Sequence, residues 1–230
     1  MDTSNPASLD ADCGLLRAAG ASTVCAVLDM VGVAGTSCHL HPVAARRAFA
    51  GPAFTVQASV GALGSQPPGA FDIAAYADGA ARGAVIAIDA GGAAVSVAGG
   101  IAALATQLRG VEAWVVDGGM RDLDELHDLT MPIHLRHGTA VSGRTRVRIE
   151  PTGVPVQIDG LTVQAGDVLV GDRSGIACVP QALLARVVRM AAWITERDRL
   201  ARALVLQGSG FADAFAAATA RHTEAQGRLE

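Results

Sequence analysis

Apolar and polar positions alternate through the middle of the chain in a way that predicts strands separated by helices. Two apolar runs, at 84–88 and 114–116, are typical of buried strands. A glycine-rich segment, 89–100, follows the first run. Apolar residues at helical spacing come next, and these are Ile101, Leu104, Ala105 and Leu108. The order strand, glycine loop, helix, strand favours a parallel crossover.

Shorter elements are expected before and after this central segment. We expect residues 1–12 to be loose and a short helix to run from Ser22 or Thr23 to Met30. The remaining expected elements, in chain order, are a strand at 51–57, helices at 71–81 and 123–129, a strand at 133–135, and short strands between 147 and 179 with a hairpin turn at 159–160.

The end of the chain predicts helices over 181–230, since Leu183, Val187, Met190 and Ile194 fall on one helical face. We find neither an internal repeat nor a linker, so we expect one domain over 1–230. Half of the 230 residues are apolar and only 3% are aromatic, which suits an α/β protein with small side chains between helices and sheet.

Charge and cysteine content exclude several function classes. The net charge of −4 indicates no general attraction to nucleic acid. The four cysteines form no Cys-x-x-Cys pair, which argues against a zinc or redox motif. No charged leader precedes an apolar core and no apolar run reaches about 18 residues, so we expect a cytoplasmic protein that contacts no membrane.

The chain contains no lysine, because all 18 of its basic residues are arginine. Any mechanism that needs a lysine amine is therefore excluded. Retro-aldol cleavage requires an electron sink, either a lysine Schiff base or a Lewis-acid metal. If this chain is an aldolase, only the metal route remains.

The start of the helix after the glycine loop is a candidate anion site. The amides of Gly99, Gly100, Ile101 and Ala102 lie where the first turn leaves its N–H groups unpaired, and such a terminus binds carboxylate or phosphate. Glycines also let a ligand approach the backbone closely. The alternative is a tight turn without a ligand.

Arg121 and Asp122 follow the next predicted strand. Parallel sheets bind ligands at the carboxyl ends of their strands, so this pair and the helix start at Gly99 are expected to converge on one pocket. An arginine grips a carboxylate or carbonyl, and an aspartate holds a hard cation such as Mg²⁺. The alternative is a surface ion pair at the start of a helix.

At these residues the chain resembles the regulator of ribonuclease activity A-like (RraA-like) family, which includes metal-dependent 4-hydroxy-4-methyl-2-oxoglutarate aldolases. The similar blocks, in family order from about residue 20 to 210, are 51–56, the glycine loop and helix from Gly99, 115–122, 132–138 and 168–180. The resemblance implies a swivelling β/β/α domain with mixed sheets flanked by helices. It also implies a homotrimer, or a hexamer of paired trimers.

The resemblance implies a divalent-metal-dependent pyruvate aldolase or decarboxylase that acts on small 2-oxo acids through a pyruvate enolate. Arg121 would contact the keto acid and the enolate, and Asp122 would anchor Mg²⁺ or Mn²⁺. The amides from Gly99 to Ala102 would receive the substrate carboxylate. The alternatives are a non-catalytic regulator that binds a ribonuclease and a pathway-specific enzyme that reuses the pocket.

Three details differ from the family. Ile101 stands where many members carry a glutamate, Gly99 stands where they often carry an aromatic residue, and the turn at 172–175 lacks a second acid. Aldolase members also use an acidic group from a neighbouring subunit, which the sequence does not locate.

Other candidate residues have structural explanations that we prefer. His39 and His41 beside Cys38 are a possible metal pair, although a loop before Pro42 explains them as well. The further candidates are His134 and His137 at a strand end, the alternating Arg144, Arg146 and Arg148, and Ser142, which has no base in view.

Overall fold

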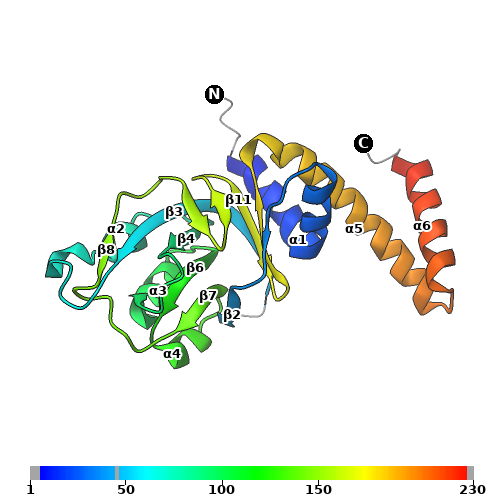
Figure 1. Cartoon of the computed structure of the whole chain (residues 1–230). Coiled ribbons are helices and arrows are strands. Elements are labelled where there is room, and N and C mark those ends of the chain that lie inside the picture. The colour runs from blue at the N-terminus through cyan, green and yellow to red at the C-terminus, as the bar shows by residue number, and fades with distance from the viewer. Residues whose placement is uncertain (1–5, 45–46, 227–230) are drawn as a thin grey trace.

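The structure is a computed structural model that describes residues 6–44 and 47–226. A mixed sheet of ten strands forms its centre, in the order β1-β12-β11-β3-β4-β6-β7-β2, with β5 beside β6 and β8 beside β3. Helices cover the sheet, and a helical arm extends from one end of the molecule (Figure 1). The expected mixed sheet flanked by helices is confirmed.

The strands of the sheet are β1 (Thr36–Ser37), β2 (His41–Ala44), β3 (Phe49–Val60), β4 (Val85–Asp89), β5 (Ser96–Ala98), β6 (Ala113–Met120), β7 (Ile133–Gly138), β8 (Val147–Ile149), β11 (Val168–Asp172) and β12 (Gly175–Val179). A separate hairpin consists of β9 (Val156–Ile158) and β10 (Leu161–Val163). The helices are α1 (Pro6–Met30), α2 (Ala74–Ala77), α3 (Gly100–Leu108), α4 (Leu123–His127), α5 (Leu184–Leu206) and α6 (Phe211–Gln226), with short 3₁₀ turns η1 (Pro68–Ala70) and η2 (Gln181–Leu183).

The parallel part of the sheet is β3-β4-β6-β7, as the crossover pattern predicts. Every residue of β4 and β6 is buried. Parallel strands covered on both faces have this pattern, and it explains their continuous apolar runs. One face carries the largest core cluster, which includes Trp114 and Tyr76 beneath α2 and α3. The hairpin β9–β10 covers the other face of the same strands with Val156, Ile158 and Val163.

A second group of helices packs beside β11 and β12. Helix α1 contacts α5, β11 and β12, and its apolar side chains join a core cluster with α5. The segment Ala7–Met30 of α1 is long and apolar enough to cross a membrane by length and composition alone, but Leu16, Val24 and Leu28 are buried against the rest of this molecule. We therefore interpret α1 as a core helix.

Two expectations about helices are wrong. The described part of the segment expected to be loose is helical, because α1 starts at Pro6. Gly20, at φ 79° and ψ 164°, interrupts α1. A second helical segment follows Gly20. At its start the backbone amide of Ala21 donates a hydrogen bond to the Asp172 carboxylate at 2.9 Å. The helix expected at 71–81 is only the four residues of α2.

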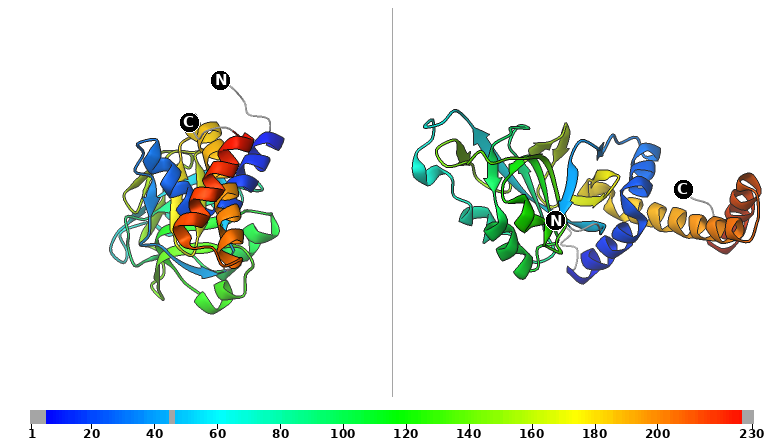
Figure 2. Two further views of the ribbon diagram at one scale, coloured as in Figure 1. Left: turned by 90° about the vertical axis from the view of Figure 1, so that its right-hand side faces the viewer. Right: turned by 90° about the horizontal axis from the view of Figure 1, so that it is seen from below.

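The last two helices form the arm. Helix α5 extends beyond the sheet and α6 folds back along it, as the views agree (Figures 1 and 2). The ring of Trp193 on α5 lies 4.8 Å from that of His222 on α6. Arg197 lies 5.7 Å from the Trp193 ring and 5.4 Å from that of Phe215. Aromatic and cation–π contacts therefore hold the two helices together.

Candidate functional site

The candidate site lies where β6 ends and α3 begins. Ser96 of β5 pairs with Gly119 of β6, so the glycine loop returns alongside the strand before α3 starts. The amide of Arg121 then donates to the carbonyl of Ala98 at 3.1 Å. This backbone pairing brings the residues after β6 to the first turn of α3, as the convergence argument predicts.

The Asp122 carboxylate is bonded to the start of α3. The Gly100 amide donates to Asp122 Oδ2 at 3.1 Å, and the Nε of Arg121 lies 3.3 Å from the same oxygen. Both contacts end on Oδ2, and within the described chain no other group bonds to this carboxylate. Oδ1 is consequently free to bind an additional ligand.

The backbone of Asp122 has an uncommon conformation, with φ 61° and ψ 44°. Aspartate and asparagine adopt this left-handed region more readily than other residues that carry a Cβ. The conformation turns the chain between β6 and α4 and aims the carboxylate back at α3. A Cβ added at Gly99 would lie 2.2 Å from Asp122 Oδ2, so only glycine admits this approach.

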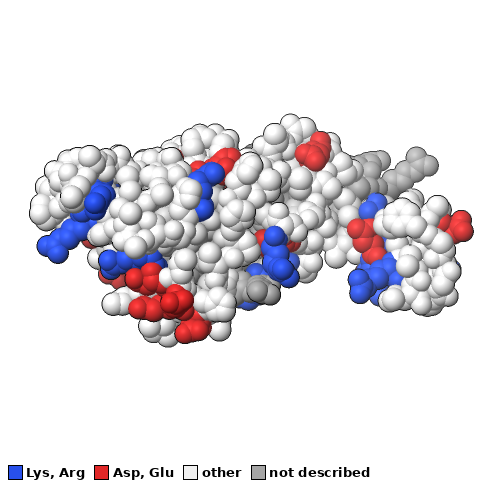
Figure 3. Space-filling model, turned by 60° about the horizontal axis from the view of Figure 1, so that its bottom comes forward, with Lys and Arg blue, Asp and Glu red and all other residues white. Residues whose placement is uncertain are grey.

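Arg121 is available to a ligand, because 52% of its side chain is exposed. Its surroundings are acidic, since Asp122, Asp124, Glu125 and Asp128 lie on or beside α4. Acidic side chains gather over this end of the molecule with arginine next to them (Figure 3). The charges would therefore attract a cation, which in turn would attract an anionic substrate.

The other predicted residues lie on the first turn of α3. Ala102 is partly buried, whereas Ile101 is 83% exposed. Leu104 and Leu108 continue an exposed apolar stripe along the helix. The amides of this turn remain candidates for a carboxylate, except that of Gly100, which already donates to Asp122.

The residues fit a divalent cation of the hard type. Mg²⁺ is bound through one or two carboxylates and several waters, and the free Oδ1 of Asp122 supplies such an oxygen. Over residues 6–44 and 47–226, no three or more His, Cys, Asp or Glu side chains form a metal cluster. A cation at this site would therefore depend on water and substrate for most of its ligands.

A cleft of about 580 Å³ adjoins the site. It is lined by β2, α4 and the β11–β12 turn, with Asp124, His127 and Arg173 among its polar residues. Leu123 and Asp124, which line it, directly follow Asp122. The cleft therefore lies next to the Arg121–Asp122 pair, and neither residue lines it.

The alternative candidates have structural partners. His39 Nδ1 lies 2.9 Å from Asp159 Oδ2, and the Nε2 of His137 donates to the carbonyl of Gly92 at 3.0 Å. Arg146 donates to the carbonyl of Ser142, and Arg148 donates to the side chain of Gln66. These contacts favour the structural explanations given above.

His134 is a buried histidine of the central sheet. Its Nε2 donates to the carbonyl of Asp172 at 2.9 Å, and Nδ1 is buried with no partner in the described residues. Burial lowers the pKa of His134 below its usual value. Its ring also packs edge-on against Phe49 at 5.4 Å. These features indicate a residue of the core.

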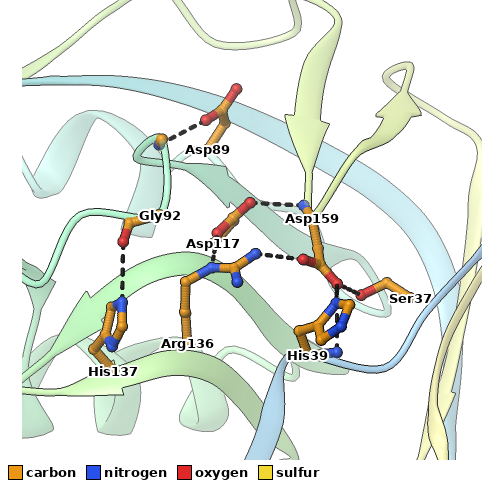
Figure 4. A network of polar contacts seen from close by, with 9 residues as sticks. Ser37, His39, Asp89, Gly92, Asp117, Arg136, His137 and Asp159 are labelled. Atoms are coloured by element: carbon orange, nitrogen blue, oxygen red, sulfur yellow. Dashed lines mark hydrogen bonds and ion pairs between the residues drawn. The ribbon is translucent and has the colours of Figure 1, made fainter.

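Sequence reasoning missed a charged network beneath the β9–β10 hairpin (Figure 4). Arg136 Nε donates to Asp117 Oδ1, and Arg136 Nη2 donates to Asp159 Oδ1, each at 2.5 Å. The backbone amide of Asp159 donates a hydrogen bond to Asp117 Oδ2 at 2.6 Å, and the hydroxyl of Ser37 donates one to the Asp159 carboxylate. Asp89, the register partner of Asp117, accepts the amide of Gln157 at 2.9 Å.

The network attaches the hairpin to the ends of the parallel strands. Burial alone would raise the pKa of Asp159, but hydrogen bonds from Ser37, Arg136 and His39 outweigh it and hold the pKa well below its usual range. The signal in the sequence is that two buried strands each reach an aspartate, Asp89 and Asp117. The expected turn at Asp159 is confirmed, with φ 50° there and 83° at Gly160.

Comparison with known proteins gives consistent results. A model of the RraA-like family, described as Aldolase/RraA, matches residues 21–178. A protein of Methanocaldococcus jannaschii described as uncharacterized is 29% identical over 118 residues, which are 51% of this chain and 56% of that protein. The chain thus spans little more than half the length of this relative.

Two further proteins carry functional names. A putative 4-hydroxy-4-methyl-2-oxoglutarate aldolase of Halalkalibacterium halodurans is 28% identical over 170 residues, which are 74% of this chain and 77% of that protein. The crystal structure of a Streptomyces coelicolor protein, described as an unusual member of the RNase ES inhibitor RraA protein family, has a TM-score of 0.74 at 22% identity. The match covers 84% of this chain and 96% of that one, and it shows the shared fold.

Proposed function

The chain belongs to the RraA-like family, and from that premise we propose that it is a divalent-metal-dependent lyase of small 2-oxo acids. The substrates in this proposal are 4-hydroxy-4-methyl-2-oxoglutarate or oxaloacetate, both of which pass through a pyruvate enolate. The name of the Halalkalibacterium halodurans relative supports the aldolase class. The lack of lysine supports the metal route.

The geometry of Arg121 and Asp122 carries the proposal. Asp122 has one oxygen bonded to the Gly100 amide and one free, which suits a fixed ligand for Mg²⁺ or Mn²⁺. Arg121 lies half exposed beside Asp122. Its guanidinium group stays protonated, so it supplies a permanent positive charge and does not itself transfer a proton. An anchored carboxylate and an adjacent guanidinium therefore present opposite charges to one substrate.

Each group has one role in the reaction. The bound metal supplies a Lewis acid for the keto oxygen. The amides of Ile101 and Ala102, in the first turn of α3, orient the substrate carboxylate. Arg121 stabilises the negative charge that develops on the keto oxygen as the bond between C3 and C4 breaks.

The atoms balance in both reactions. In aldol cleavage, a water held by Arg121 takes the proton of the 4-hydroxyl group. The electron pair of the C3–C4 bond then becomes the enolate while the C4 fragment leaves as the first pyruvate, and return of the same proton from that water to C3 gives the second pyruvate. In decarboxylation the same electron pair forms the enolate when CO₂ departs, and a proton from water at C3 gives pyruvate.

The direct test is pyruvate release from a panel of 2-oxo acids, with and without EDTA. We expect release that EDTA abolishes and that added Mg²⁺ or Mn²⁺ restores. Pyruvate release unaffected by chelation would refute the metal route, and no release from any 2-oxo acid would refute the lyase assignment.

A second candidate function is binding to a ribonuclease. The exposed stripe of Ile101, Leu104 and Leu108 on α3 favours a protein contact, because neighbouring apolar side chains of this size seldom face solvent together. The name of the Streptomyces coelicolor structure gives the partner class for that protein. Co-purification of a ribonuclease, together with failure of the pyruvate assay, would favour this candidate.

The same stripe suits an interface between copies of the chain. In our proposal the protein is a cytoplasmic homotrimer or a hexamer of paired trimers, and it uses neither nucleic acid nor membrane as partner. Light scattering at several protein concentrations measures the assembly. A monomer at all concentrations would contradict it.

A further inference from the structure

A second cleft lies at the opposite end of the parallel strands from Arg121 and Asp122. Its volume is about 500 Å³, and it is enclosed by α1, the start of β3 and the loops before β4 and β6. Gly83, which lines it, comes just before β4, and Glu112 comes just before β6. The cleft is therefore at the amino ends of these strands, whereas the candidate site follows the carboxyl end of β6.

One side of this cleft is largely apolar. Leu9, Cys13 and Arg17 lie four positions apart along α1, so this helix presents one face to the cleft. Ala50 and Pro52 of β3 line the cleft as well. Burial raises the pKa of Cys13 to about 11, so its thiol is uncharged at neutral pH and adds no negative charge. Apolar walls with a few charged groups are typical of a site for a small organic molecule.

Positive charge exceeds negative charge among the described residues around the cleft. Glu112 Oε1 lies 3.1 Å from Arg17 Nε and 2.9 Å from Arg47 Nη1, so two arginines share one carboxylate. Asp10 and Arg82 also line the cleft. In this part of the described chain three guanidinium groups thus accompany two carboxylates, and the excess positive charge attracts an anion.

Arg17 is held at the cleft by contacts within its own chain. Its Nη2 donates to the carbonyl of Ala50 at 3.3 Å, and its Nε is paired with Glu112. The side chain is nevertheless 38% exposed, so part of it is accessible from the cleft. Because this guanidinium group is already fixed, it loses little conformational entropy when it binds a ligand.

Arg82 is the second cation of the cleft. It is exposed, and within residues 6–44 and 47–226 it forms neither a hydrogen bond nor an ion pair. Its side chain lies over Gly110, where an added Cβ would be 2.8 Å from Arg82 Nη1. Its N–H donors are therefore available, and arginine binds phosphate through paired hydrogen bonds.

We propose that this cleft binds a small organic phosphate, with the phosphate group between Arg17 and Arg82 and the apolar part against Leu9 and Pro52. A phosphate monoester carries about −1.5 to −2 charges at pH 7, which suits two guanidinium groups better than the single charge of a carboxylate. The proposal concerns a site separate from the candidate site, and its test does not depend on pyruvate release.

The experiment measures binding of phenyl phosphate to the full chain by isothermal titration calorimetry at low ionic strength. EDTA is present, so that no divalent metal binds the phosphate elsewhere. We expect Arg82→Gln to weaken binding by about tenfold or more, because it removes one of the two guanidinium groups. Arg82 has no partner in the described chain, so this variant is expected to fold normally, which circular dichroism checks.

Arg109→Gln is the matched control. Arg109 is exposed and directly precedes Gly110, but it does not line the cleft, and its Nη1 lies 3.5 Å from Asp78 Oδ1. The variant removes the same charge from the same region, so we expect binding to weaken by less than about threefold. Equal weakening by Arg82→Gln and Arg109→Gln, or no binding of phenyl phosphate by the unmodified chain, would overturn the proposal.

Arg121→Gln distinguishes this cleft from the candidate site. We expect it to bind phenyl phosphate as the unmodified chain does, because Arg121 follows the opposite end of β6. Loss of binding in Arg121→Gln with normal binding in Arg82→Gln would assign the phosphate to the candidate site and would refute the proposal.

Two further probes test the class of ligand. Inorganic phosphate lacks the apolar part, and benzoate carries a carboxylate on the same ring. We expect each to bind at least about threefold more weakly than phenyl phosphate. Benzoate binding as tight as that of phenyl phosphate would refute the assignment to phosphate, and equally tight binding of inorganic phosphate would refute the contact with Leu9 and Pro52.

Discussion

The amide of Gly100 and the carboxylate of Asp122 lie 3.1 Å apart, although 22 positions separate them in the chain. This bond joins the start of α3 to the residues that follow β6. It uses one oxygen of Asp122 and leaves the other for a ligand. The bond therefore fixes the orientation of the group on which the proposed chemistry depends.

The first prediction concerns the two charged residues of the site. Arg121→Gln and Asp122→Asn should each lower metal-dependent pyruvate release by at least about a hundredfold, because the first removes the cation that would stabilise the enolate and the second removes the carboxylate that would hold the metal. Asparagine tolerates the left-handed backbone at position 122, so the fold should persist. Steady-state assays and circular dichroism measure both effects.

Arg144→Gln is the control for that experiment, since this exposed arginine lies outside the site. Its activity should match that of the unmodified chain. If Arg121→Gln retained the same activity as Arg144→Gln, the role of Arg121 would be refuted.

The second prediction concerns Gly99. In Gly99→Ala the new methyl group would lie 2.2 Å from Asp122 Oδ2, so the carboxylate must move and the bond to Gly100 must break. We expect activity to fall by about tenfold or more and stability by about 1–3 kcal/mol. Urea unfolding and the pyruvate assay measure the two losses.

Gly14→Ala is the matched control, because Gly14 lies in α1 with no atom within 4 Å of an added Cβ. Alanine is favoured over glycine in a helix, so this variant should gain up to about 1 kcal/mol and keep its activity. A comparable loss of activity in both variants would contradict the proposed effect of the Asp122 contact.

The third prediction concerns the network beneath the hairpin. Arg136→Met would leave Asp117 and Asp159 facing each other without their shared cation. We expect a loss of about 3 kcal/mol in the free energy of unfolding, since removal of one partner from a buried ion pair leaves uncompensated charge. Urea unfolding at neutral pH measures it, and a loss below about 1 kcal/mol would contradict the structural role.

The fourth prediction is a dependence of stability on pH that arises from His134. Its pKa is lowered in the folded chain, so between the unfolded pKa of about 6.5 and the lower folded value the unfolded state binds more protons. Stability should therefore fall as pH decreases below about 6.5. His134→Phe should reduce this slope, as measured by urea unfolding between about pH 7 and pH 5.

A control variant separates this effect from other histidines. The control is His127→Gln, since this exposed histidine lies outside the core. If His134→Phe had the same pH profile as His127→Gln, burial of His134 would not be the cause of the slope.

Periodicity predicted the elements that depend on local sequence. The apolar runs of β4 and β6 and the helical spacing of α3 were read correctly, since burial on both faces imposes these patterns. Helix α2 is shorter than expected, and α1 is longer because its two segments meet at Gly20. These errors occur where glycine and tertiary packing override the local pattern.

The sequence by itself determined the parallel crossover, the absence of a lysine-based mechanism and the pairing of Arg121 with Asp122 at a strand end. Only the tertiary structure decided that Asp122 bonds to Gly100 and that Arg136 joins Asp117 to Asp159. The physical reason is that strand register and side-chain packing bring together groups distant along the chain, and no local pattern encodes such contacts.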